Sequence, residues 1–241
     1  MLFRSKRFSN GLTSVVFVTW MKNLSNVFGG NTLFADDAGI QYPPARTIVM
    51  DPGISPVTFG ASWGYELPFG KNKRFFNSAS PVVSRIVSGW EINGSVRYAT
   101  GTALQITANN NLGALGYPAK LADYVGGQPV FLKSNPRDFD PAKDRYLNSA
   151  AFAVPATFSL GNTARYLDWA RGWTQKSEAL SVGKKTQLNE GTLLEISADF
   201  TNPFNFVRWS NPNTNITSAA FGTVTGTAPG RTAQLNASLK F

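Results

Sequence analysis

Four segments of this chain alternate between apolar residues and polar or small residues with a period of two, each over ten residues or more: 57–67, 89–100, 192–201 and 232–241. In the first of them the apolar positions are Val57, Phe59, Ala61, Trp63, Tyr65 and Leu67. This period predicts β-strands with one apolar and one polar face. Soluble strands average about 5–6 residues, whereas a tilted membrane-spanning strand needs about 9–11. The length of the alternation therefore favours strands that cross a membrane.

Charged residues in these segments keep to one face. The apolar faces contain none, and the polar faces contain Glu66, Glu91, Arg97, Glu195, Asp199 and Lys240. A half-buried sheet in a soluble sandwich also alternates, but a lysine or arginine facing lipid at the middle of a membrane costs about 2–4 kcal/mol. Only 15% of all residues are charged, against about 25% in soluble proteins. We therefore expect the apolar faces to contact lipid.

Two further segments, 12–22 and 173–184, are weaker strand candidates because the first is apolar on both sides and the second alternates only in part. They bring the count to six long strands. The longest apolar run, residues 12–21, is too short and too polar for a membrane helix of about 20 residues. It also stands too far from the small residues near Ala35 to form a convincing export signal.

The connections alternate between long and short. Residues 23–55, 101–172 and 202–230 are long and rich in Asn, Gly and Pro, whereas Pro68–Lys71 and Lys185–Glu190 predict compact turns. Transmembrane barrels have long loops at one end and short turns at the other. The sequence thus predicts an all-β fold, an antiparallel transmembrane β-barrel segment of about six long strands with long external loops.

The chain contains neither cysteine nor histidine. Disulfides, thiolate nucleophiles, Ser-His-Asp triads and metal sites held by cysteine or histidine are therefore excluded. Asp138, Asp140 and Asp144 lie close in the sequence, and carboxylates bind Ca²⁺, but the glycine and the distal glutamate of an EF-hand loop are missing. We favour a loop of Asx-turns here. We predict no enzymatic activity, no cofactor and no metal site.

Several stretches, taken in order, resemble a known family. They are Arg7–Leu12, Tyr65–Lys71, Gly89–Gly94, Leu147–Phe152, Phe200–Asn205, Ser210–Thr214 and Arg231–Phe241. Together they are similar to the C-terminal barrel portion of TonB-dependent outer-membrane receptors, in particular the Oar-like barrels common in Acidobacteria. The resemblance covers nearly the whole chain. It implies a location in the outer membrane and, in the full receptor, uptake of a large or scarce ligand with energy supplied through TonB.

The last strand carries the most diagnostic part of the resemblance. Its alternate residues, Ala233, Leu235, Ala237, Leu239 and Phe241, look like the signal that the barrel-assembly machinery recognises. The alternative is an ordinary edge strand that ends in phenylalanine. An unpaired apolar edge is an aggregation hazard in a soluble protein, whereas a closed barrel pairs it with the first strand.

The resemblance also implies a topology with the C-terminus in the periplasm. Six strands counted back from Phe241 then place Met1 in the periplasm and the three long loops outside. Three basic clusters would share the periplasmic rim: Arg4, Lys6 and Arg7; Lys71, Lys73 and Arg74; Lys184 and Lys185. We consider two interpretations, contact with anionic lipid headgroups and basic turns in water.

Receptors of this kind have about 22 strands and an N-terminal plug, and the smallest common barrels have about 8 strands. The chain has six recognisable strands, no plug-like region and no segment like a TonB box. We therefore expect a C-terminal fragment, comprising residues 1–241, that lacks the N-terminal barrel and the plug. It would contact TonB only through the full-length receptor and would not transport alone.

Within such a barrel the charges Glu91, Arg97, Glu195 and Asp199 would face the lumen. There, carboxylate–guanidinium contacts would brace the wall or a plug, and a role in substrate contact is the alternative. The aromatic residues near the strand ends would form girdles at the membrane interface: Trp63, Tyr65, Trp90, Tyr98 and Phe200. The alternative for these residues is ordinary packing.

Other classes of function fit less well. A basic, aromatic-rich sheet resembles a nucleic-acid platform in composition, but here the aromatics share faces with aliphatic residues and the basic residues gather in turns, so we expect no nucleic-acid partner. A secreted β-sandwich that binds carbohydrate remains the second interpretation. The partners expected for the barrel are outer-membrane lipid and the barrel-assembly machinery.

Overall fold

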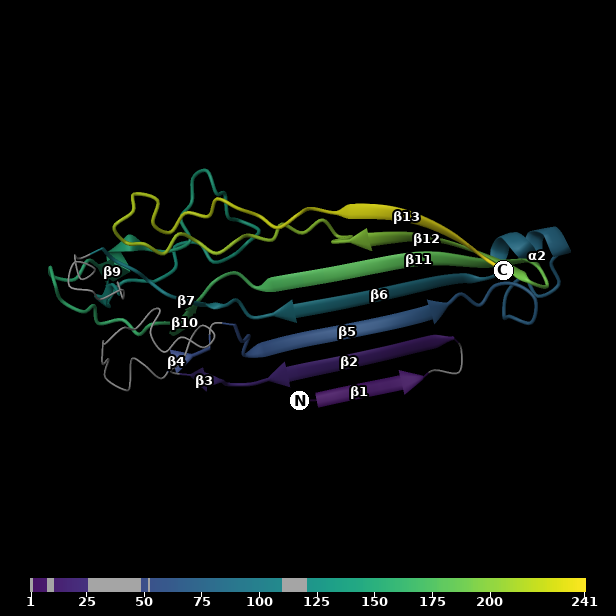
Figure 1. Ribbon diagram of the computed structural model, residues 1–241, viewed down its shortest axis with the longest axis horizontal. Coiled ribbons are helices and arrows are strands. Elements are labelled where there is room, and N and C mark those ends of the chain that lie inside the picture. The colour runs from purple at the N-terminus through teal and green to yellow at the C-terminus, as the bar shows by residue number, and fades with distance from the viewer. Residues whose placement is uncertain (1, 8–10, 26–48, 52, 110–120) are drawn as a thin grey trace.

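The computed structural model describes residues 2–7, 11–25, 49–51, 53–109 and 121–241. Seven strands form one antiparallel sheet in the order β1-β2-β5-β6-β11-β12-β13 (Figure 1). Their bounds are β1 (Leu2–Arg7), β2 (Leu12–Trp20), β5 (Val57–Glu66), β6 (Trp90–Ala99), β11 (Gln175–Asn189), β12 (Thr192–Thr201) and β13 (Thr232–Lys240). Each strand pairs with the next sheet strand along the chain. The sheet is open, because β1 and β13 form its two edges and do not pair with each other.

The six long strands and their antiparallel order are confirmed. β12 has the predicted bounds, and four others end within one or two residues of them. β11 differs, since it begins at Gln175 and continues to Asn189. Thr186 and Gln187, predicted to lie in a turn, extend the ladder by pairing with Leu194 and Leu193 of β12. The turn itself lies at Glu190 and Gly191.

A seventh, shorter strand precedes the six. β1 pairs with β2 so that Leu2 is opposite Val18 and Arg7 is opposite Thr13. Three of its six residues are basic, and the segment shows no alternation in the sequence. Because the count is seven, Leu2 begins at the opposite end of the sheet from the end of β13. The expectation that the first residues lie at the same end as the C-terminus is therefore wrong. Met1 itself lies outside the described residues.

The connection between β5 and β6 is not the compact turn expected at Pro68. It runs over residues 67–89 and contains helix α2 (Pro81–Val87). The Ser80 hydroxyl caps this helix by accepting a hydrogen bond from the Val83 N–H, and Pro81 takes the first helical position. The fold is therefore mostly β with a short helix. In the part of the chain that the structure describes, no helix is long and apolar enough to span a membrane.

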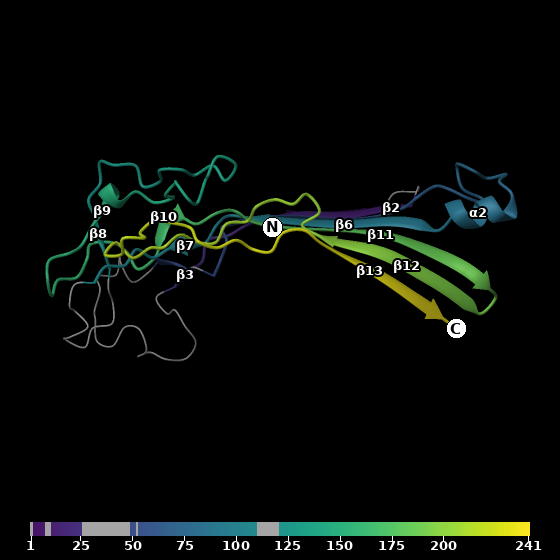
Figure 2. The same cartoon turned by 90° about the horizontal axis from the view of Figure 1, so that it is seen from above.

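The connections leave the sheet at two distinct ends (Figures 1 and 2). The turn end carries the β5–β6 connection with α2 and the β11–β12 turn. The loop end carries the three long connections, and we call residues 101–109, 121–174 and 202–231 the loop layer. It contains paired short strands, β7 (Ala103–Leu104) with β10 (Leu167–Arg171) and β8 (Asp123–Tyr124) with β9 (Phe152–Ala153), and a 3₁₀ turn, η2 (Ser149–Ala151). Another short pair, β3 (Leu24–Ser25) with β4 (Val49–Met50), belongs to the β2–β5 connection.

The hydrophobic core lies in the loop layer and not in the sheet. Its buried members are Leu104, Ile106, Ala108, Ala122, Phe139, Tyr146, Leu147, Ala151, Phe152, Leu167, Ala170, Trp173, Phe221 and Val224. Among the six long strands, Ala99 is the buried hydrophobic residue. Figure 2 shows the sheet edge-on as a single layer. The sheet thus leaves both faces open, while the long loops fold around an interior of their own.

Candidate functional site: the two faces of the sheet and the loop layer

The strand register collects the predicted apolar residues on one face. Directly opposed residues of an antiparallel pair lie on the same face. Phe59 is opposite Tyr98, Leu194 is opposite Leu239, and Ala198 is opposite Leu235. The same holds along β5, β6, β12 and β13, so these strands present one continuous apolar face. We call the other side the polar face.

Large side chains on the apolar face are exposed. Trp20 is 77% exposed, Leu235 is 82% exposed and Ile196 is 47% exposed. A contiguous apolar surface of this extent is rare on a soluble monomer and marks contact with a partner or a membrane. Among the described residues no second sheet covers this face. An apolar solvent is therefore the environment that suits it.

Two glycines are covered by aromatic rings from a neighbouring strand. A Cβ atom built on Gly94 would lie 2.2 Å from Cζ2 of Trp63, on the apolar face. A Cβ atom on Gly60 would lie 2.2 Å from Cζ of Phe17, on the polar face. Each ring fills the space that a side chain would occupy at the glycine. This packing fixes the register between the two strands. Trp63, predicted as a girdle residue, therefore also packs against the wall itself.

The other predicted girdle residues lie near the two ends of the apolar face. Tyr65 and Trp90 are near the turn end, and Tyr98 and Phe200 are near the loop end. Trp20 joins them at the loop end, opposite Val57. Sequence reasoning missed Trp20 because its segment is apolar on both sides. A role in anchoring at the membrane interface stays a prediction.

The predicted assembly residues of β13 share the apolar face. Ala233, Leu235, Ala237 and Leu239 are opposite Phe200, Ala198, Ile196 and Leu194 of β12. Phe241 follows the strand and is exposed. Recognition by the assembly machinery stays a prediction.

β11 carries charged residues on the apolar face, which the sequence did not predict. The register places Glu178 opposite Val96, near the loop end, and Lys184 opposite Trp90, near the turn end. The two positions are six residues apart, about 20 Å along a strand. Between them lie Leu180 and Val182. The charges thus flank the central stretch of the apolar face.

Glu178 is paired inside the protein. Its side chain is 0% exposed, and its Oε2 lies 2.6 Å from Nη2 of Arg208 in the loop layer. Its backbone carbonyl also accepts a hydrogen bond from the Asn202 N–H. A buried carboxylate is costly unless a close counter-charge compensates it. The Glu178–Arg208 pair therefore ties the β12–β13 connection to the neighbouring strand.

The ammonium group of Lys184 is stabilised without a counter-charge. Its Nζ donates to the carbonyl oxygens of Arg85, Ile86 and Ser88 at distances of 2.9, 2.9 and 2.7 Å. The same nitrogen lies 5.2 Å from the centre of the Trp90 ring. The last carbonyls of a helix have no partner within the helix. Lys184 supplies partners at the C-terminal end of α2.

The predicted basic rim is confirmed only in part. Lys184 and Lys185 lie on opposite faces of β11, and Nζ of Lys185 is 2.9 Å from Oε2 of Glu91. Arg4 and Lys6 are paired along β2, opposite Val16 and Ser14, and not gathered at its end. The cluster of Lys71, Lys73 and Arg74 does lie in the turn-end connection.

Ion pairs cross the polar face near the turn end. Lys185 of β11 pairs with Glu91 of β6, and Lys240 of β13 pairs with Glu195 of β12 at 2.7 Å. The predicted charges Glu91 and Glu195 thus do brace the wall, but through lysine ammonium groups and not through guanidinium groups. Arg97 forms no ion pair with any residue that the structure describes.

Asp199 is held by neutral donors. Its carboxylate accepts hydrogen bonds from Oγ of Ser181 at 2.5 Å, Oγ of Ser197 at 3.2 Å and Nδ2 of Asn236 at 2.5 Å. These donors come from β11, β12 and β13. Asp199 therefore links three neighbouring strands on the polar face.

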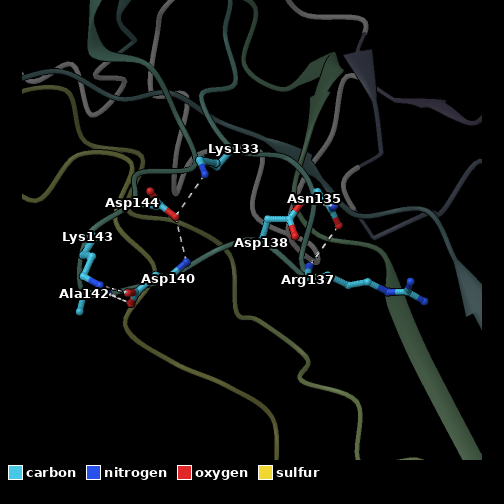
Figure 3. Close-up of polar contacts among 8 residues, drawn as sticks. All are labelled: Lys133, Asn135, Arg137, Asp138, Asp140, Ala142, Lys143 and Asp144. Atoms are coloured by element: carbon cyan, nitrogen blue, oxygen red, sulfur yellow. Dashed lines mark hydrogen bonds and ion pairs between the residues drawn. The ribbon is translucent and has the colours of Figure 1, made fainter.

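The aspartate loop forms Asx-turns, as predicted (Figure 3). Oδ1 of Asp140 accepts from the Ala142 N–H at 3.0 Å, and Oδ1 of Asn135 accepts from the Arg137 N–H at 3.1 Å. Oδ2 of Asp144 closes the loop by accepting from the Asp140 N–H at 2.9 Å. Asp138 accepts instead from the Asn135 side chain. The Ala142 N–H and Lys143 hold the pKa of Asp140 below its usual value. The described residues contain no group of three or more side chains of metal-binding type placed to hold an ion.

An aromatic cluster occupies the centre of the loop layer. The ring centres of Tyr146 and Trp173 are 4.3 Å apart, and Phe139 contacts both Trp173 and Trp209. The Tyr146 hydroxyl donates to the Arg171 carbonyl at 2.7 Å, and burial raises the pKa of Tyr146 to about 12. Trp173 was predicted to begin a strand but belongs to this cluster. No periodic pattern marks the cluster in the sequence.

Comparison with known proteins agrees with this geometry. A sequence model of the outer membrane beta barrel domain matches residues 3–234. No curated protein and no solved structure matches the chain significantly. The matched residues include nearly all of the sheet and the whole loop layer, and they place the protein in the outer membrane, with lipid as the apolar solvent that its sheet requires. The chain belongs to the family of outer membrane β-barrel domains.

Proposed function

We propose that this sheet is part of the wall of a TonB-dependent receptor of the Oar-like type. The full receptor would take up a large or scarce ligand, with energy supplied through TonB. The observation that carries the proposal is an open sheet in which β5, β6, β12 and β13 separate apolar from polar residues, with free edges at β1 and β13. Unpaired backbone groups are not tolerated in lipid, so both edges need further strands.

In this proposal the turn end lies in the periplasm and the loop layer lies outside the cell, as in other outer-membrane barrels. The loop layer has its own buried core, so it would present a fixed surface to an incoming ligand. The polar face would line the lumen, where Glu91, Glu195 and Asp199 brace the wall beside a plug. Partners would be the remaining barrel and plug, outer-membrane lipid, the barrel-assembly machinery and, through the full receptor alone, TonB.

The second interpretation, a secreted β-sandwich that binds carbohydrate, has less support. A sandwich requires a second sheet about 10 Å from the first. The further sheets among the described residues are two-stranded pairs in the long connections. Tyr146 and Trp173, which would suit a sugar site, are buried in the loop core.

An immunoblot of native outer membranes tests the proposal, with an antibody raised against the loop layer. We expect a heat-modifiable band far larger than the 26.1 kDa of this chain, and we expect that band to form chemical cross-links with TonB. A 26.1 kDa species as the sole product, without TonB cross-links, would overturn the receptor proposal and leave the family membership unaffected.

A further inference from the structure

Helix α2 presents an apolar surface that no other part of the described chain covers. Val82 is 69% exposed and Ile86 is 62% exposed, with Val83 beside them, and none of the residues in α2 is buried. Residues three and four apart share a side of a helix, so these three side chains form one apolar stripe. Ser84 lies on the opposite side. The stripe needs a partner.

The place of the helix indicates which partner this is. Trp90 and Lys184 both lie on the apolar face of the sheet at its turn end. Nε1 of Trp90 donates to the Ile86 carbonyl at 3.0 Å, and Lys184 donates to three carbonyls at the same helix end. The C-terminal end of α2 is therefore fixed to the lipid-facing side of the wall.

The polar groups at this helix end are unusually well satisfied for such an exposed element. A helix end that enters an apolar environment must find partners for its free carbonyls, since water does not provide them there. Lys184 and Trp90 provide four hydrogen bonds to the carbonyls of Arg85, Ile86 and Ser88. In water these carbonyls would need no such arrangement.

The charge of the surrounding connection also fits a membrane surface. Residues 67–89 contain four basic residues, Lys71, Lys73, Arg74 and Arg85, and no acidic residue. Phe75 and Phe76 are exposed beside them. Basic groups next to exposed apolar side chains are typical of segments that lie in a lipid interface.

We propose that α2 is an interfacial anchor, whose stripe of Val82, Val83 and Ile86 inserts into the phospholipid leaflet at the turn end while the basic residues contact anionic headgroups. Lys184 is the positioning residue that holds the helix against the wall. The anchor would fix how deep the sheet sits in the membrane. It requires the membrane location of the family but not TonB-dependent uptake.

Single cysteines test the anchor directly, because the chain has none of its own. We would place an NBD fluorophore at V82C, at I86C and, as a water-exposed control at the same end of the sheet, at E190C, in outer-membrane vesicles that contain the full protein. We expect nitroxide-labelled phospholipid to quench the labels at 82 and 86 at least threefold more than the label at 190, and aqueous iodide to show the reverse order.

Two other outcomes overturn the proposal. Equal iodide quenching at all three sites would place α2 in water. Protection of sites 82 and 86 from both quenchers would show that protein, and not lipid, covers the stripe. Replacing the anionic phosphatidylglycerol by zwitterionic lipid should reduce lipid quenching at both sites, and an unchanged signal would contradict the headgroup contact.

Two adjacent lysines, Lys184 and Lys185, allow a controlled test of whether Lys184 positions the helix. Lys184→Met should reduce lipid quenching at site 86 at least twofold, whereas Lys185→Met, which breaks the Glu91 pair on the other face, should not change it. If Lys184→Met fails to insert, Ile86→Asp with the label at 82 takes its place, and Ser84→Asp serves as its control. An unchanged signal in Lys184→Met, or in Ile86→Asp, would contradict the proposal.

Discussion

The loop layer and the sheet use apolar residues in opposite ways. In the loop layer, Ile106, Leu147 and Phe221 are almost completely buried and pack against one another. In the sheet, Leu235, Ile196 and Trp20 point outward and are exposed. The hydrophobic effect stabilises the loop layer through a protein interior, as in a soluble domain. The sheet needs lipid for the same purpose, so one chain contains parts that are suited to different solvents.

The two regions are also held together by different kinds of interaction. Backbone ladders and cross-strand polar contacts, such as those of Asp199, hold the strands together. Side-chain packing and Asx-turns hold the loops together. We therefore expect mutations to act by different rules in the two regions, and the predictions below compare matched changes in each.

The largest effect should come from the core of the loop layer. Leu147→Ala removes a side chain that is 0% exposed, and such changes cost about 2–5 kcal/mol. Leu235→Ala, the same change on the apolar face, opens no cavity and should cost less than Leu147→Ala, because only the transfer free energy of the removed groups between water and lipid is lost. Amide hydrogen exchange in the loop layer and the strands would measure both. Equal losses in the two variants would contradict the division between the regions.

A charge placed on the sheet should discriminate between its faces. Ala198, opposite Val182 and Leu235, lies in the middle of the apolar face. Ala198→Arg should destabilise the protein in lipid vesicles by about 2–4 kcal/mol. Ser197→Arg is the control, because its side chain would lie on the polar face near Asp199 and should cost far less. Urea unfolding in vesicles compares the two, and a greater cost for Ser197→Arg would reverse our assignment of the faces.

The smallest effect concerns pH and the loop layer alone. The pKa of Tyr146 is about 12 in the folded protein and about 10 in an unfolded chain. The folded state therefore holds this proton more tightly, and its contribution to stability is complete below about pH 10 and is lost as the pH rises towards 12. Tyr146→Phe should remove this part of the alkaline destabilisation and cost about 0.5–1.5 kcal/mol at neutral pH through the lost hydrogen bond to Arg171.

The difference between wild type and Tyr146→Phe in hydrogen exchange across this pH range isolates the effect. Other tyrosines and the lysines titrate in both proteins and cancel. Parallel pH profiles for the two proteins would show that the Tyr146 hydroxyl is not buried in the folded loop layer.

The long strands could be predicted from the sequence because the constraint on their residues, apolar on one face and polar on the other, repeats every two residues. Lipid on one face excludes charge from every second position, which fixes both the strands and their faces, as along Thr192–Thr201. The bounds of β11 were predicted less accurately, because Lys184 and Glu178 interrupt its apolar face. Their partners are carbonyls at the end of α2 and the Arg208 side chain. A sequence pattern does not show partners that lie far apart in the chain.

The fold of the loop layer could not be predicted from the sequence, because its contacts also join residues that lie far apart in the chain. Its core joins residues such as Leu104, Leu147 and Phe221, whose spacing follows no period. The Asx-turns around Asp140 were predicted because they are local, whereas the packing of Trp173 against Tyr146 depends on the path of the whole loop. Ser80 and Pro81 are local signals for the start of helix α2, but the helix has only seven residues, too few to show a helical period in the sequence.

The central claim is that alternate residues of one strand face lipid and water. The most direct test labels single cysteines at consecutive positions 194–199 of β12 in outer-membrane vesicles. Our account predicts that labels at Leu194, Ile196 and Ala198 are quenched by nitroxide-labelled lipid and labels at Glu195, Ser197 and Asp199 by an aqueous quencher, in strict alternation. Uniform access of the aqueous quencher to all six positions, or the opposite alternation, would contradict the account.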